Sequence, residues 1–187
     1  MVQVLELREN KNTMQNEKQI VLGVDPGYSG AFVFSDGKDI LHQCKIIIDK
    51  NELINGKILL EHLAKIDYFH MCNTVVLEHP HSIFGIAASA NWKLGESFGS
   101  LYTFLSTHFE NIVLVRPKKW QKSVLLVEDI VLKKDESKDT KKTSIKACER
   151  LFPDHDFRDL VNKPRARVAD HNFCDAALLS KYYFNIQ

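Results

Sequence analysis

Residues 20–27 read IVLGVDPG, and this stretch decides the fold class. The short apolar run at 20–24 predicts a strand that is buried on both faces. Pro26 and Gly27 are turn residues, so the predicted strand ends directly at Asp25. A carboxylate at the end of a buried strand either caps the turn or binds a ligand, and this stretch alone leaves both interpretations open.

The pattern on the carboxyl side of this stretch predicts further strands and helices. Short apolar runs bounded by turn residues predict strands, and leucines at helical spacing predict helices. We expect strands at 20–24, 31–35, 40–48, 74–77 and 112–115, and helices at 52–69, about 90–109 and about 170–183. Three leading strands followed by alternating helices and strands predict an α/β fold in which helices cover a mixed sheet. In such sheets, ligands bind beyond the carboxyl ends of the strands.

The chain has 187 residues and a mass of 21.5 kDa, which is the size of one ordinary domain. Residues 1–19 are polar and aperiodic, so we expect a flexible arm there and a single domain at 20–187. Hydrophobic residues make up 44% and charged residues 26%, which excludes wholesale disorder, collagen and coiled coil. No apolar run reaches the roughly 18 residues of a membrane span. The N-terminus lacks the pattern of a signal peptide, and we therefore expect a cytoplasmic protein with no membrane partner.

Two further acids lie where a buried carboxylate needs a partner. Glu78 follows the apolar residues of the fourth predicted strand, and Asp175 lies among alanines and leucines of the last predicted helix. A half-buried carboxylate costs several kcal/mol unless it is paired or bound to a metal. Pairing with His79, His81 or an arginine is the alternative for Glu78. If the first and fourth strands are neighbours, all three acids converge in one oxygen-rich pocket.

Two residues at the start of the last helix are candidates to complete this pocket. His171 precedes Asp175 by four positions, so both lie on one face of the helix. Asp170 lies about 140° around the helix axis from Asp175 and is also a natural N-cap. Carboxylates in such a pocket suit the hard cations Mg²⁺ and Mn²⁺ rather than zinc. Two such ions roughly 3.5–4 Å apart can activate water and stabilise the leaving oxygen of a phosphodiester.

Several short motifs resemble a known family when they are taken in order. They read VLGVDPG at 21–27, VLE at 76–78, GESFG at 95–99, VRPKKWQK at 115–122, DTKKTS at 139–144, LFP at 151–153 and DHNFCDAAL at 170–178. Together they are similar to the RuvC family of Holliday junction resolvases, within the ribonuclease H-like superfamily, and most similar to its small phage-type members. The resemblance covers about residues 20–184.

This resemblance implies a fold and an activity. The fold is a ribonuclease H-like mixed five-stranded sheet flanked by helices. The activity is that of a homodimeric, Mg²⁺-dependent endonuclease, with two ions per site and Mn²⁺ as a substitute, which resolves four-way DNA junctions by paired nicks. A phage-encoded protein of this kind would act in the host cytoplasm.

The resemblance also assigns roles to particular residues. The family's acids of the first strand, the fourth strand and the last helix correspond to Asp25, Glu78 and Asp175. Its remaining ligand lies about three residues before the last acid, where this chain has Asn172 instead. Helix geometry favours His171 in this role, or as a general acid or base, whereas acid chemistry favours Asp170. The family further places an aromatic wedge soon after its second acid, and Phe84 is either that wedge or a core residue.

Positive charge is concentrated in one part of the chain. Residues 116–167 contain 15 lysines and arginines against 9 acids, whereas the rest of the chain contains 10 against 15. Such a region is either a solvated helical face or a surface that binds a polyanion. The predicted DNA contacts are Lys93, Arg116, Lys118, Lys119, Lys122, Lys141, Lys142, Arg165 and Arg167. Trp120 lies among these residues and is expected to be buried.

Three other functions are compatible with parts of the sequence. ATP-binding proteins of the sugar-kinase and actin type also begin with a three-stranded meander and an acidic turn, but they need two such domains. A nuclease of the same fold could instead cut other branched DNA or RNA–DNA hybrids. A catalytically silent binding module would have no need for three costly buried acids.

Overall fold

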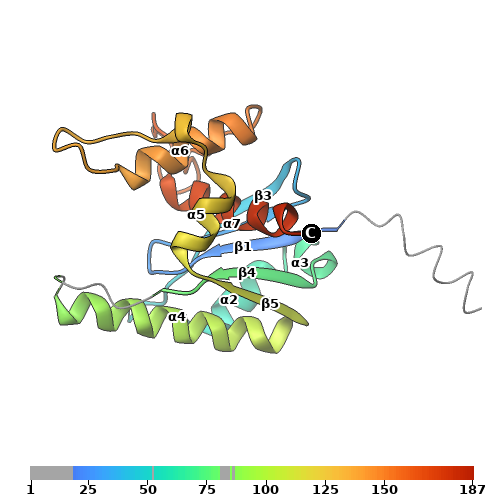
Figure 1. The fold of residues 1–187 in the computed structure, drawn as a ribbon. Helices are drawn as coiled ribbons and strands as arrows, with labels where there is room; N and C mark the ends of the chain where they lie inside the picture. Colours follow the sequence, from blue (N-terminus) through green and yellow to red (C-terminus); the bar gives the residue numbers. More distant parts are fainter. Residues whose placement is uncertain (1–18, 52, 81–84, 86) are drawn as a thin grey trace, which may run out of the picture.

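The computed structural model describes residues 19–51, 53–80, 85 and 87–187. Its middle layer is a five-stranded mixed sheet with the strand order β3-β2-β1-β4-β5 (Figure 1). The strands are β1 (Val21–Asp25), β2 (Ala31–Ser35), β3 (Ile40–Lys45), β4 (Thr74–Glu78) and β5 (Asn111–Val115). β2 is antiparallel to both β1 and β3, whereas β4 and β5 run parallel to β1. The carboxyl ends of β1, β3, β4 and β5 therefore lie at one edge of the sheet.

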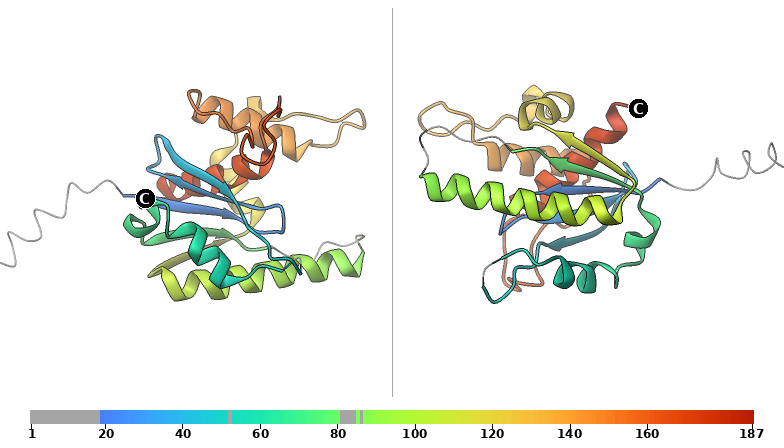
Figure 2. Two further views of the ribbon diagram at one scale, coloured as in Figure 1. Left: turned by 180° about the vertical axis from the view of Figure 1, so that it is seen from behind. Right: turned by 90° about the horizontal axis from the view of Figure 1, so that it is seen from below.

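Helices cover both faces of this sheet (Figures 1 and 2). One face is covered by α2 (Gly56–Leu63), α3 (Asp67–Met71) and α4 (Ala88–His108). The other face is covered by α5 (Pro117–Val124), α6 (Thr140–Leu151) and α7 (His171–Asn185), with the short 3-10 helix η2 (Val127–Asp129) between α5 and α6. This arrangement confirms the predicted α/β class with a mixed sheet flanked by helices.

The central strand β1 is buried against both helical layers. Leu22 and Val24 pack with the α2–α4 layer and Val21 packs with the α7 layer, because successive strand residues point to opposite faces. Gly23 lets α7 approach closely, since a Cβ atom there would lie 1.9 Å from the backbone oxygen of Ala176. The strand and the helix that carry two of the predicted acids are thus in direct backbone contact.

The structure corrects two predicted boundaries. The helix expected at 52–69 is divided into α2 and α3, because the backbone is extended at Ile66, with φ −99° and ψ 116°. The strand expected at 40–48 ends at Lys45, because Ile48 beyond it forms an isolated bridge with Ile54 instead of pairing with β2.

Some predictions concern residues outside the described part of the chain. The expected N-terminal arm lies there except for its last residue, and so does the candidate wedge Phe84. Among the residues that the structure describes, no helix combines the length and the apolar composition needed to cross a bilayer.

Candidate active site

The acids at the ends of β1 and β4 lie side by side. These strands are parallel neighbours, and their register pairs Val24 with Leu77. Asp25 and Glu78 are the next residues along each strand and occupy the same edge of the sheet. Both side chains are half-buried, as expected for the ends of strands whose preceding residues are buried. The sequence predicted that the acids would converge if the first and fourth strands were neighbours. The structure shows that these two strands are adjacent.

The third acid reaches this edge from α7. Burial raises the pKa of Asp25 well above its usual range, and the nearby charges of Asp175 and Glu78 raise it further. Burial also raises the pKa of Asp175 to about 7, with a further increase from Glu78, against the hydrogen bond from Ser144. Three carboxyl groups that repel one another from two strands and a helix share one small region. Such a region favours either protons or an added cation.

Glu78 is held by a tryptophan from the basic helix α5. The indole Nε1 of Trp120 donates a hydrogen bond of 2.6 Å to Oε2 of Glu78. Burial raises the pKa of Glu78, and this hydrogen bond works in the opposite direction. Trp120 is only 1% exposed, so its expected burial is confirmed. Sequence reasoning assigned this residue to the core and missed its contact with the acid.

Asp170 has two partners of its own. Its carboxylate caps α7 by accepting a hydrogen bond from the backbone nitrogen of Asn172 (2.9 Å), and it pairs with Nζ of Lys45 at 2.8 Å. Burial would raise the pKa of Asp170, but the hydrogen bond and charge of Lys45 outweigh it and lower this pKa. Nζ of Lys45 also donates to the carbonyl oxygen of Ser29 and lies 4.7 Å from the ring centre of Phe173.

Lys45 is a site residue that sequence reasoning missed. It is the last residue of β3, which runs in the same direction as β1, so it reaches the same edge as the acids. Its charge lowers the pKa of Asp25 against the effect of burial. No pattern in the sequence singled it out, because the predicted strand continued to residue 48 and only the structure ends it at Lys45.

His171, the alternative to Asp170, begins α7 one turn before Asp175. Burial lowers the pKa of its imidazole, and the positive charge of Lys141 lowers it further. The ring is therefore favoured in its neutral form, which can accept a proton. The two candidates differ in state, since Asp170 is an ion-paired carboxylate and His171 is a neutral base.

The donor chemistry of the site suits a hard divalent cation, but its ligand set is not preformed. Among residues 19–51, 53–80, 85 and 87–187, no group of three or more His, Cys, Asp or Glu side chains is placed so that it could hold a metal ion. The partners explain part of this arrangement, because Trp120 holds Glu78 and Lys45 holds Asp170. Carboxylate oxygens are the ligands that Mg²⁺ and Mn²⁺ prefer, so the residue types fit such an ion although their placement does not yet form its ligand set.

The predicted DNA contacts are exposed and lie on several elements. Arg116, Lys118, Lys119 and Lys122 belong to the exposed side of α5, which starts directly after β5. Lys141 and Lys142 lie in the first turn of α6, Arg165 and Arg167 precede α7, and Lys93 lies in α4, all of them exposed. The charge of Lys141 lowers the pKa values of both Asp175 and His171.

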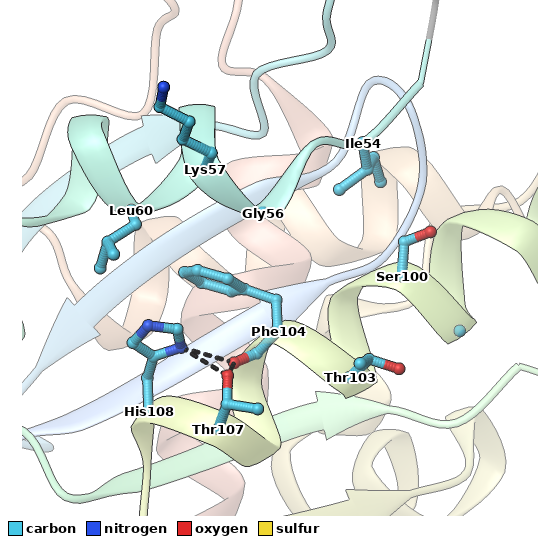
Figure 3. A pocket seen from close by; sticks show the side chains of 10 residues that line it. Ile54, Gly56, Lys57, Leu60, Ser100, Thr103, Phe104, Thr107 and His108 are labelled. Atoms are coloured by element: carbon cyan, nitrogen blue, oxygen red, sulfur yellow. Dashed lines mark hydrogen bonds between the residues drawn. The ribbon is translucent and has the colours of Figure 1, made fainter.

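A separate hollow lies away from the acids. It has a volume of about 680 Å³ between α2 and α4, and Figure 3 shows Phe104 and His108 among the residues that line it. Its lining contains Ile54, Lys57 and Leu60 from one side and none of the predicted site residues. The candidate chemistry is thus at the edge of the sheet and not in this hollow.

The strand order and the two helical layers define a ribonuclease H-like fold, as the sequence predicted. No protein-family model and no curated protein matches the chain. Solved structures share its fold, and they include the following three. RuvC of T. thermophilus in complex with a Holliday junction substrate has a TM-score of 0.56 at 11% identity, over 89% of this chain and 93% of that chain.

The other two structures give similar values. A second structure of Thermus thermophilus RuvC has a TM-score of 0.53 at 12% identity, over 90% of this chain and 96% of that chain. The yeast mitochondrial Holliday junction resolvase Ydc2 has a TM-score of 0.51 at 12% identity, over 90% of this chain and 78% of that chain. The fold is therefore that of RuvC, and the resemblance to phage-type members stays a prediction.

Proposed function

We propose that this chain is a metal-dependent, structure-selective endonuclease that resolves four-way DNA junctions by paired nicks. The observation that carries this proposal is the convergence of Asp25, Glu78 and Asp175 at the carboxyl edge of a RuvC-like sheet. The solved structures of this fold include RuvC with a Holliday junction substrate and a yeast Holliday junction resolvase. The basic residues around this edge supply the charge that a polyanion requires.

The chemistry we propose is hydrolysis of a phosphodiester. Bound Mg²⁺ or Mn²⁺, two per site, supplies an activated water and neutralises charge on the phosphate. Asp25, Glu78 and Asp175 are the proposed ligands, and burial, which raises the pKa of all three, is a cost that a bound cation would offset. Asp170 is the proposed fourth carboxylate, and neutral His171 is a general base at the same edge.

We also propose that the protein acts as a homodimer on branched DNA. Paired nicks in two strands require two sites, and each chain carries one edge of this kind. Sedimentation of the protein alone and with a four-way junction measures this directly. A complex with a single chain per junction would contradict it.

Cleavage of matched substrates tests the proposed activity. The protein is incubated with a four-way junction, a linear duplex and an RNA–DNA hybrid, with Mg²⁺ or with a chelator. We expect metal-dependent symmetric nicks in the junction alone. Equal cutting of every branched form, or of the hybrid, would support instead the second candidate, a broader nuclease of the same fold. ATP turnover without cleavage would indicate the kinase-like alternative.

Two variants make this test specific to the site. Asp25→Asn should abolish cleavage and leave junction binding intact, because it removes a ligand charge without changing the size of the side chain. Asp154→Asn is the matched control, since Asp154 is exposed and lies outside the acidic cluster. Cleavage that survives Asp25→Asn would exclude Asp25 as an essential residue.

A further inference from the structure

Trp92 is an unusually exposed tryptophan near the start of α4. Its side chain is 71% exposed, whereas the only other tryptophan of the chain, Trp120, is 1% exposed. A tryptophan carries a large apolar surface that is usually buried in a core or at a contact. The indole face of Trp92 is therefore open to solvent and free to stack against a ligand.

Contacts of the first turns of α4 place Trp92 close to the acidic edge. Tyr28, three residues after Asp25, donates a hydrogen bond to Glu96, which lies one helical turn after Trp92. Residues four apart on a helix share a face, so Trp92 projects on the side of α4 that faces this loop. On the next strand, the ring of His79, directly after Glu78, packs edge-on against Phe98 of α4 at 5.2 Å.

The ribbon shows where these turns lie relative to the sheet. The first turns of α4 project beyond the carboxyl ends of β1 and β4, and the segment between η2 and α6 projects in the same direction from the other side (Figures 1 and 2). That second segment contains three lysines and three acids, so it carries no net charge.

Lys93, the next residue after Trp92, supplies the positive charge that a phosphate requires. Nζ of Lys93 lies 5.9 Å from the ring centre of Tyr28, so the ammonium group is held beside the loop that follows Asp25. An exposed indole next to a cation matches the two parts of a nucleotide, because every base has a face that stacks and every phosphate has a negative charge.

We propose that Trp92 and Lys93 form a nucleotide-binding platform, on which an unpaired base of DNA stacks on the indole while its phosphate pairs with the ammonium group. This inference rests on the proposed DNA-cleaving function and adds a preference for strands whose bases are accessible. Bases in a continuous duplex are stacked on one another, whereas bases at a branch point can leave the stack. The platform thus favours branched DNA over duplex.

Binding to a strand with and without bases tests the platform. The probes are a labelled oligothymidylate and an abasic oligomer of equal length, both measured by anisotropy without divalent cations so that no strand is cut. We expect the protein to prefer the oligothymidylate by roughly 5- to 150-fold. Trp92→Ala should abolish this preference and leave the salt dependence of binding unchanged. Trp92→Phe, which keeps an aromatic face, should retain most of it.

Lys93→Ala is the matched variant, because it removes the charge and leaves the ring. It should keep the preference for bases and lower the slope of log affinity against log salt by roughly 0.7 for a single strand. Tryptophan emission gives a second readout, since only Trp92 is accessible to quenching by a stacked base. In Trp92→Phe, emission should no longer change when DNA is added.

The outcomes separate this inference from the proposed function. If Trp92→Ala keeps the full preference for bases while junction cleavage persists, the platform is wrong and the nuclease stands. If the wild-type protein neither binds nor cuts DNA, the nuclease and the platform both fall. If Trp92→Ala binds DNA normally but changes the sedimentation of the protein, the indole is a contact between chains, and the platform is again wrong.

Discussion

The carboxylate of Glu78 and the indole of Trp120 form a pair that joins a catalytic candidate to the basic helix α5. The hydrogen bond fixes one oxygen of Glu78 and leaves the other for a ligand. It also opposes the effect of burial on the pKa of Glu78. We therefore propose that Trp120 is a positioning residue, which acts on the chemistry through Glu78.

Trp120→Phe tests this role. Phenylalanine keeps an aromatic ring in the core but lacks the N–H donor, so Glu78 loses its partner. Because changes in residues that orient a metal ligand cost about 10- to 100-fold in activity, we expect a loss of this size in single-turnover junction cleavage. Urea unfolding of Trp120→Phe, Glu78→Ala and the double variant gives the control. A coupling free energy below about 0.5 kcal/mol between the two changes would contradict a direct contact.

The raised pKa of Asp175 predicts how the stability of the metal-free protein depends on pH. Its pKa is raised to about 7 by burial, from an ordinary value near 3.8. Between these values the folded protein holds a proton that the unfolded chain has lost, so the free energy of unfolding falls as pH rises from about 4 to 7. A tenfold difference in proton affinity between the two states corresponds to about 1.4 kcal/mol, which makes the expected loss a few kcal/mol.

Thermal unfolding in the presence of a chelator measures this loss. Asp175→Asn cannot ionise, so it should flatten the pH dependence and be more stable than the wild type at pH 8. Asp154→Asn should leave the curve unchanged, because this acid is exposed. If the wild-type protein became more stable between pH 4 and 7, a buried protonated Asp175 would be excluded.

At the scale of elements, the contact between β1 and α7 brings Asp25 and Asp175 together. Gly23→Ala tests it, since the added Cβ would lie 1.9 Å from the backbone oxygen of Ala176. Backbone cannot move aside as a flexible side chain does, so we expect a loss of about 3 kcal/mol or more in the free energy of unfolding. Cleavage should fall as well, because α7 carries an acid of the site.

Gly99→Ala in α4 is the matched control for this prediction. No atom lies within 4 Å of a Cβ built at Gly99, and alanine is the better helix former by about 1 kcal/mol. This variant should be as stable as the wild type or more so. Equal effects of the two alanines would mean that the approach of α7 to β1 does not require a glycine.

The same scale explains what could be predicted from the sequence. Asp25 and Glu78 could be predicted as site residues because each ends a short apolar run, and strand ends meet at one edge of the sheet. The break between α2 and α3 at Ile66 could not be predicted, because helical spacing continues across it. Only the structure shows that the backbone is extended there. The pairing of Lys45 with Asp170 spans 125 positions and depends on the strand order, which no local pattern encodes.

At the scale of the whole molecule, the distribution of charge separates two tasks. The acids gather at the sheet edge, while the excess of lysine and arginine over 116–167 lies on elements around it. A polyanion attracted by that excess is brought to carboxylates that would repel it without a counter-charge. The residues expected to attract the polyanion thus differ from the acids at the sheet edge. Each set can therefore be altered without changing the other.

Replacing Lys118 and Lys119 together by alanine tests the attraction alone. Both are exposed in the first turn of α5, directly after β5, and neither pairs with an acid of the site. We expect weaker binding to every DNA sequence by a similar factor, because contacts with phosphates carry no sequence information. The slope of log affinity against log salt should fall by about 0.9 for each lost phosphate contact on duplex arms.

Lys57→Ala with Lys65→Ala is the matched control, because these lysines are equally exposed but lie in and after α2, on the opposite face of the sheet. It removes the same net charge from the molecule as the α5 variant does. If attraction depended only on net charge, both double variants would lower the salt slope alike. A fall confined to the α5 variant would instead place the DNA along the helix that holds Glu78 through Trp120.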